Sequence, residues 1–72
     1  MAKRINDIDP DGLRIVIPWE ELRVGSSVFV PCINVEACER QALRIGRMLG
    51  LSLACRTRIE GQHIGLRIWR TA

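Results

Sequence analysis

The most constraining pattern in this chain is a strict alternation of apolar and polar residues on both sides of one tight turn. Over residues 51–59, one side of the chain carries Leu51, Leu53, Cys55, Thr57 and Ile59. Residues 64–68 repeat the alternation with Ile64, Leu66 and Ile68. A period of two indicates half-buried strands, and the turn residues between them predict an antiparallel hairpin. The implied register sets apolar residues opposite apolar residues, and it also sets Arg56 opposite Arg67.

The segment before this hairpin has the period of an α-helix. Asn34 is a suitable N-cap and Gly50 a suitable left-handed C-terminal stop, so the spacing predicts a helix over residues 35–49. Its core-facing stripe is expected to contain Cys38, Ala42, Ile45 and Leu49, flanked by Val35 and Met48.

Two shorter segments in the first half are also predicted as strands. Residues 13–17 alternate, with Arg14 and Val16 on the outer face, and residues 28–30 place Val28 and Val30 inward. A single helical turn at Trp19 is expected between them, and residues 1–12 are expected to be a polar lead-in rich in turn residues. The prediction is one α+β domain over residues 13–72. Its architecture is a two-layer β-β-α-β-β arrangement, an antiparallel sheet with one helix packed on one face.

Charge is divided unevenly along the chain. Residues 40–72 contain seven arginines and one acid, Glu60, and therefore carry +6. Residues 1–39 contain four basic residues and seven acids, and therefore carry −3, which accounts for the net +3. This asymmetry favours a polyanionic or acidic partner.

The sheet face that the helix leaves uncovered is the first candidate site. It is expected to display Arg14, Val16, Phe29, Ala54, Arg56, Arg58, Arg67 and Trp69. Arginines interleaved with aromatic side chains on an open sheet are typical of RNA and single-strand binders, and an anion would relieve the like-charge pair of Arg56 and Arg67. The alternative for this face is self-association, a homodimer surface made of Val16, Phe29 and Trp69 with arginines at its rim.

The outer helix face is the second candidate. Arg40, Arg44 and Arg47 recur at the spacing of one helix face, a stripe that can follow phosphates but that also suits an ordinary solvated surface. Leu43 lies among them, and an apolar residue surrounded by charges resembles a protein-binding hot spot.

The sequence favours neither catalysis nor metal binding. His63 is the single histidine and lies on the hairpin turn, without an acid oriented toward it except Glu60. The cysteines are odd in number and lack the ligand spacing of a zinc site, so Cys38 and Cys55 are expected to be free and buried. A position near the helix start could lower the pKa of Cys32, although no base accompanies it. We therefore expect a non-enzymatic protein with no metal and no cofactor.

The same composition bears on location. No apolar stretch approaches the ~20 residues that span a bilayer. Residues 1–4 lead into polar residues rather than an apolar run, so no signal peptide is expected. These features predict a cytoplasmic protein without membrane partners.

Two short strings carry a resemblance that spans residues 19–71. They are Val24-Gly25-Ser26-Ser27-Val28-Phe29-Val30-Pro31 and, after the basic helix, Gly65-Leu66-Arg67-Ile68-Trp69-Arg70. The chain thereby resembles small phage-encoded proteins of unknown function with a VG-S-F-VP, helix, G-R-WR outline. The resemblance implies a phage or prophage origin and hence the cytoplasm of a bacterial host. In its order of strands and helix the chain is also similar to small phage inhibitors of host RNA polymerase, which is a likeness of architecture alone.

These observations lead to one functional hypothesis and one alternative. The hypothesis is a non-catalytic phage accessory protein that binds nucleic acid through Arg56, Arg58, Arg67 and Trp69, assisted by Arg40, Arg44 and Arg47. The alternative is a small phage inhibitor or modulator. It would use the same basic surface, or Leu43, to bind an acidic surface of a host protein such as RNA polymerase or a defence complex.

Overall fold

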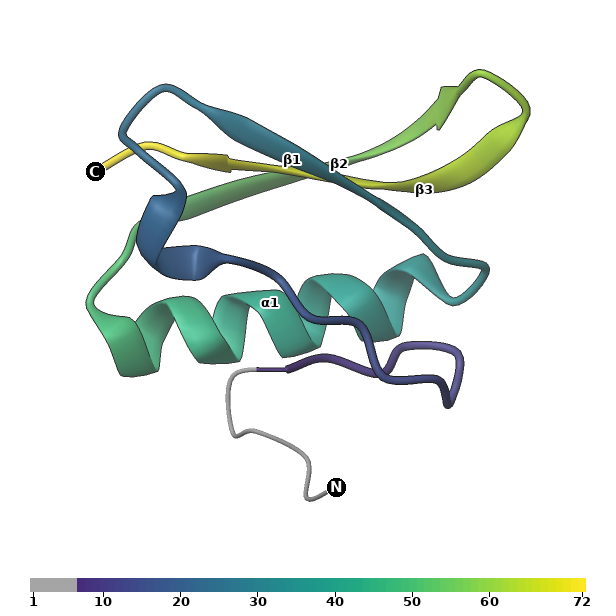
Figure 1. Ribbon diagram of the computed structural model, residues 1–72, viewed down its shortest axis with the longest axis horizontal. Coiled ribbons are helices and arrows are strands. Elements are labelled where there is room, and N and C mark those ends of the chain that lie inside the picture. The colour runs from purple at the N-terminus through teal and green to yellow at the C-terminus, as the bar shows by residue number, and fades with distance from the viewer. Residues whose placement is uncertain (1–6) are drawn as a thin grey trace.

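The computed structural model describes residues 7–72 and shows an α+β fold (Figure 1). The elements follow in the order η1 (Trp19–Glu21), β1 (Ser27–Pro31), α1 (Val35–Leu49), β2 (Leu53–Glu60) and β3 (His63–Arg70). The three strands form one antiparallel sheet in the order β1-β3-β2, with α1 packed on one face. The predicted fold class is confirmed, but the sheet has three strands where four were expected.

The β2–β3 hairpin forms in the predicted register. Ile59 pairs with Ile64, Thr57 with Leu66, and Arg56 with Arg67. Leu66 and Ile68 on the central strand β3 are almost completely shielded from solvent. The hairpin tip, however, extends beyond the helix, and Ile59 and Ile64 are 74% and 46% exposed. Both residues lie on the predicted face of the hairpin but are not buried, because alternation identifies a face of a strand and not the length that a helix covers.

The helix has the predicted bounds and both predicted ends. The Asn34 side chain accepts a hydrogen bond from the Ala37 backbone N–H, and Gly50 takes the left-handed conformation that ends the helix. Cys38, Ala42 and Ile45 are completely buried, as predicted. Leu49 and Met48 were predicted in or beside the core stripe and are instead exposed, because they lie in the last turn, where the chain leaves the helix for β2.

The segment predicted as a strand over residues 13–17 is not part of the sheet. It makes one isolated bridge, in which Ile8 and Ile15 exchange backbone hydrogen bonds across the turn between them. Leu13 and Val16 are exposed, and Arg14 lies 3.7 Å from the buried Asp7 carboxylate. Arg14 and Val16 therefore do not belong to the open sheet face. The alternating pattern is satisfied locally, so it requires no long-range strand pairing.

The N-terminal segment packs instead on α1. It lies on the side of the helix away from the sheet and returns toward the sheet at η1 (Figure 1). The Asp11 carboxylate accepts hydrogen bonds of 2.8 Å from the backbone N–H groups of Ile33 and Asn34, and Asp9 N–H donates to Gln41 Oε1 at 2.7 Å. Ile8, within the segment interpreted as a polar lead-in, is completely buried. The core therefore has three contributors: the inner face of the sheet, one side of the helix, and this segment together with Trp19.

Residues 7–72 contain no helix with the length and apolar character needed to cross a bilayer.

Candidate nucleic-acid interface

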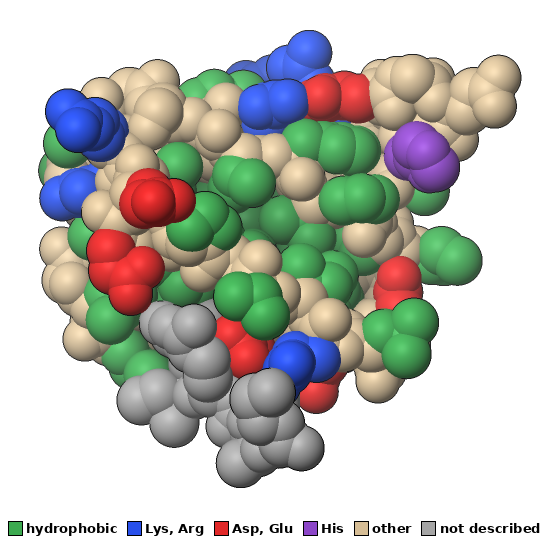
Figure 2. Space-filling view, viewed as in Figure 1, with side chains coloured by type: hydrophobic (Ala, Val, Ile, Leu, Met, Phe, Trp, Pro, Cys, Tyr) green, Lys and Arg blue, Asp and Glu red, His purple; other side chains and the backbone are tan. Residues whose placement is uncertain are grey.

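The register of the sheet brings most of the predicted outer-face residues together. Arg56, Arg67 and Phe29 form one row across the three strands, and Ala54, Trp69 and Ser27 form the next. Figure 2 shows basic and acidic side chains beside one another over the sheet. The outer face is thus mixed in charge, and its arginines differ in how they are bound.

All three guanidinium nitrogens of Arg67 donate hydrogen bonds within the protein. Its Nε and an Nη donate to the two Glu60 carboxylate oxygens at 2.6 Å each, and its other Nη donates to Ser27 Oγ at 2.7 Å. The guanidinium carbon also lies 5.9 Å from the centre of the Phe29 ring. This hydrogen-bonded pair lowers the pKa of Glu60 and raises that of Arg67. The like-charge pair of Arg56 and Arg67 therefore requires no external anion, because the Glu60 carboxylate already neutralises Arg67.

The Glu60–Arg67 pair was missed at the sequence level for a definite reason. The two residues lie on different strands, separated along the outer face by the Arg58–Gly65 pair. Gly65 has no side chain, so β3 itself places no side chain between them, and the Phe29 ring from β1 lies close to this position. A glycine two residues before an arginine on a predicted outer face is the sequence signal that could have suggested a long diagonal pair.

Arg56 and Arg58 are the arginines that the sheet leaves available. Both are exposed, and Arg58 makes only a loose contact with Glu60, 3.7 Å between Nε and Oε2. Trp69, beside Ala54 on the same face, is half-buried. Of the three residues proposed as a dimer face, Phe29 and Trp69 belong to the sheet and Val16 does not.

The helix arginines, unlike the sheet arginines, lie together in a concavity that could hold an anionic ligand. Arg40, Arg44 and Arg47 are exposed and line one concavity of about 410 Å³, together with Asp9 and Gln41. The wall of this concavity is the N-terminal segment, fixed to the helix by the Asp9–Gln41 hydrogen bond. Among residues 7–72, Asp9 is the one acidic residue that lines this concavity, against three arginines. The sequence predicted the stripe of arginines but not the wall that makes it concave.

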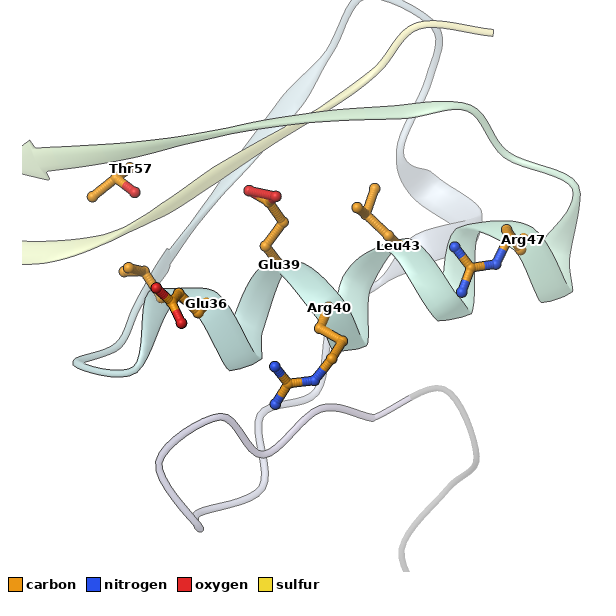
Figure 3. A pocket seen from close by; sticks show the side chains of 7 residues that line it. Glu36, Glu39, Arg40, Leu43, Arg47 and Thr57 are labelled. Carbon is orange, nitrogen blue, oxygen red and sulfur yellow. The ribbon is translucent and has the colours of Figure 1, made fainter.

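A second hollow lies on the other side of the helix stripe. Leu43 is half-buried there in a groove of about 370 Å³ between α1 and β2, lined also by Val35, Glu36, Glu39, Arg40, Arg47 and Thr57. In Figure 3, Glu39 and Leu43 point from the helix toward the sheet, whereas Arg40 points away from it. Leu43 is therefore part of the wall of a groove, where the charged residues Glu36, Glu39, Arg40 and Arg47 lie around it.

The three cysteines are free thiols, and two of them, Cys32 and Cys38, are buried. Burial raises the pKa of all three, to about 12 for Cys38 and about 11 for Cys55. The suggestion that the helix start lowers the pKa of Cys32 was wrong, because loss of solvent outweighs it. Within the described part of the chain, no three metal-ligating side chains cluster.

These thiols predict a loss of stability at alkaline pH. The folded state favours the neutral thiol, so the folded pKa exceeds the ordinary value of 9.0. The stability that this difference contributes is complete below pH 9 and is lost as the pH rises through the folded pKa values. The chain has no tyrosine and a single lysine, so few other groups titrate in this range. The urea midpoint should be constant from about pH 7 to 8.5 and fall between about pH 9 and 11. Cys38→Ala should flatten that fall, and an unchanged slope would contradict the assignment.

Residues 7–72 thus present two basic surfaces, the helix concavity and the sheet pair Arg56 and Arg58, with Arg67 reserved for an internal pair. Comparison with protein-family models, with curated proteins and with solved structures found no match to this chain.

Proposed function

We propose that this protein binds nucleic acid without catalysis and that Arg40, Arg44 and Arg47 provide its principal phosphate-binding surface. The observation that carries the proposal is their shared concavity, in which three exposed guanidinium groups lie with a single carboxylate, that of Asp9, among the described residues. A guanidinium group can donate two parallel hydrogen bonds to one phosphate. A bound phosphate would also neutralise the positive charge of the arginine. Residues at this helical spacing lie along one face, so their charges form a line that a phosphate backbone can follow.

Arg56 and Arg58 provide a second, smaller contact in this proposal, with Trp69 as a surface on which a base can stack. Arg67 is removed from the set of contacts, because its donors are already directed to Glu60 and Ser27. Its role is to hold the outer face in shape. The alternative function is binding to an acidic host protein through the same arginines. Absence of DNA binding would favour this alternative.

Fluorescence anisotropy of labelled single-stranded and duplex DNA, with nuclease-treated protein at about 50 and 200 mM salt, tests this function. Five arginine–phosphate contacts on a duplex correspond to a slope of about −4.5 in log affinity against log salt, or roughly a 500-fold loss over this range. Such a loss would support the proposal. Absence of binding to either DNA at the lower salt would overturn it.

A further inference from the structure

Among residues 7–72, strand β2 is paired along one edge only, because it lies at the end of the β1-β3-β2 order. Thr71 N–H donates to Ser52 O, and the two-residue turn closes on the pair Glu60 and His63, which fixes the alternation of hydrogen bonds. Even-numbered residues of β2 therefore bond to β3. The backbone N–H and C=O groups of Leu53, Cys55, Thr57 and Ile59 point away from the sheet, and no described residue bonds to them.

The two faces of this edge have different chemistry. Arg56 and Arg58 flank Thr57 on the outer face and are exposed. Thr57 itself faces the helix side, where it shares the groove with Val35 and Leu43 (Figure 3). Ile59, further along the same side, is 74% exposed. An added strand would thus meet the positive charge of Arg56 and Arg58 on one face. On the other face it would meet Leu43 and Ile59, with the Glu39 carboxylate also pointing from the helix toward the sheet.

We propose that β2 accepts an extended segment of an acidic partner protein as a fourth strand of the sheet. Backbone hydrogen bonds from Leu53, Cys55, Thr57 and Ile59 would hold the segment. In a strand, successive side chains alternate between faces, so acidic residues at every second position would lie beside Arg56 and Arg58. The intervening residues, which face Leu43 and Ile59, would be apolar. This binding site shares Arg56 and Arg58 with the smaller of the two proposed nucleic-acid contacts, but it does not depend on that function.

A second copy of this chain fits the edge less well. Only residues with free backbone groups can pair, so two β2 strands can overlap almost fully in just two antiparallel registers. In the first register, Arg56 of each copy lies opposite Arg58 of its partner. In the second register, the two Arg56 residues lie opposite each other. Like charges directly opposite one another are destabilising, and charged residues on an edge strand are a known obstacle to self-pairing. Charge complementarity therefore favours an acidic segment over self-association.

A labelled peptide in which Glu and Val alternate is the probe, and its control has Lys in place of Glu. The key variant is Thr57→Pro, because the Thr57 N–H makes no bond to β3 and edge strands tolerate proline at such positions. Thr57→Ala is its matched control. The Glu peptide should bind the wild type and Thr57→Ala alike, at least about tenfold more tightly than it binds Thr57→Pro, and the Lys peptide should bind more weakly than the Glu peptide by a similar factor. Thr57→Pro should leave DNA binding unchanged, which separates this site from the proposed function.

Amide hydrogen exchange of the wild-type protein gives a second readout that needs no variant. Without peptide, the amides of Cys55, Thr57 and Ile59 should exchange rapidly, and those of Arg56 and Arg58 slowly. Saturating Glu peptide should slow the first group specifically. Absence of Glu-peptide binding, equal binding by Thr57→Pro, equal binding of the Lys peptide, or binding without protection of the first group would each overturn the proposal.

Discussion

Replacement of Gly65 by alanine is expected to remove a large part of the stability of this protein. A Cβ atom at this position on β3 would lie against the Val30 carbonyl oxygen, closer than contact allows, and 2.8 Å from both Phe29 Cζ and Pro31 Cα. Two of these three atoms belong to the backbone of β1, so a side-chain rotation cannot relieve the clash. The strands would have to separate at this point in the sheet.

The magnitude is large relative to the stability of so short a chain. Overpacking usually costs about 1–3 kcal/mol and occasionally more, and the backbone clash at Gly65 places this variant at about 3 kcal/mol or above. A chain of 72 residues is expected to be stable by only about 4–11 kcal/mol. At about 4–8 °C per kcal/mol for a domain of this size, the thermal midpoint should fall by roughly 15 °C or more, as measured by circular dichroism.

Gly50→Ala is the matched control for Gly65→Ala. Gly50 has a φ of 73° and open space where the methyl group of alanine would lie, so the substitution costs only the strain of the left-handed conformation, about 1 kcal/mol. If Gly65→Ala lowers the midpoint no more than Gly50→Ala does, close packing of β1 on β3 is not what fixes glycine at position 65.

Local patterns predicted those parts of the fold whose partners are near in sequence. The hairpin register followed from one short turn between two alternating segments, and the helix bounds followed from Asn34 and Gly50. The segment over residues 13–17 carries equally good alternation, yet it bonds to Ile8 rather than to the sheet. Periodicity indicates that one face of a segment is buried, but it does not say against what.

The candidate site shows the same division. The arginine stripe on α1 could be predicted from its spacing, whereas its concavity depends on Asp9 and Gln41, which are 32 residues apart. Arg67 was expected to be available from its register alone, and only the three-dimensional path of the Glu60 side chain shows that it is occupied. Residue type and local spacing thus identified the charged groups, and tertiary contacts decided which of them are free to bind.

Simultaneous replacement of Arg40, Arg44 and Arg47 by glutamine is expected to give the largest loss of DNA affinity. Each contact removed is a charge-assisted hydrogen bond, worth about 1.5 kcal/mol or more, so three contacts correspond to a loss of well over about 100-fold. The slope of log affinity against log salt should also become shallower by about 2.7, because each of the three lost phosphate contacts contributes about 0.9. The three side chains are exposed, so the fold should remain intact, and anisotropy with circular dichroism measures both quantities.

The control must separate local contacts from overall charge. Arg23→Glu with Val24→Glu changes the net charge by −2 and −1, and thus from +3 to 0, the same as the triple glutamine variant. Both residues are exposed on the turn between η1 and β1, away from the helix stripe. If phosphates bind in the helix concavity, this control should retain most of the affinity and nearly all of the salt slope. Equal losses in the two variants would mean that DNA responds to net charge alone, and the helix stripe would then be an ordinary solvated surface.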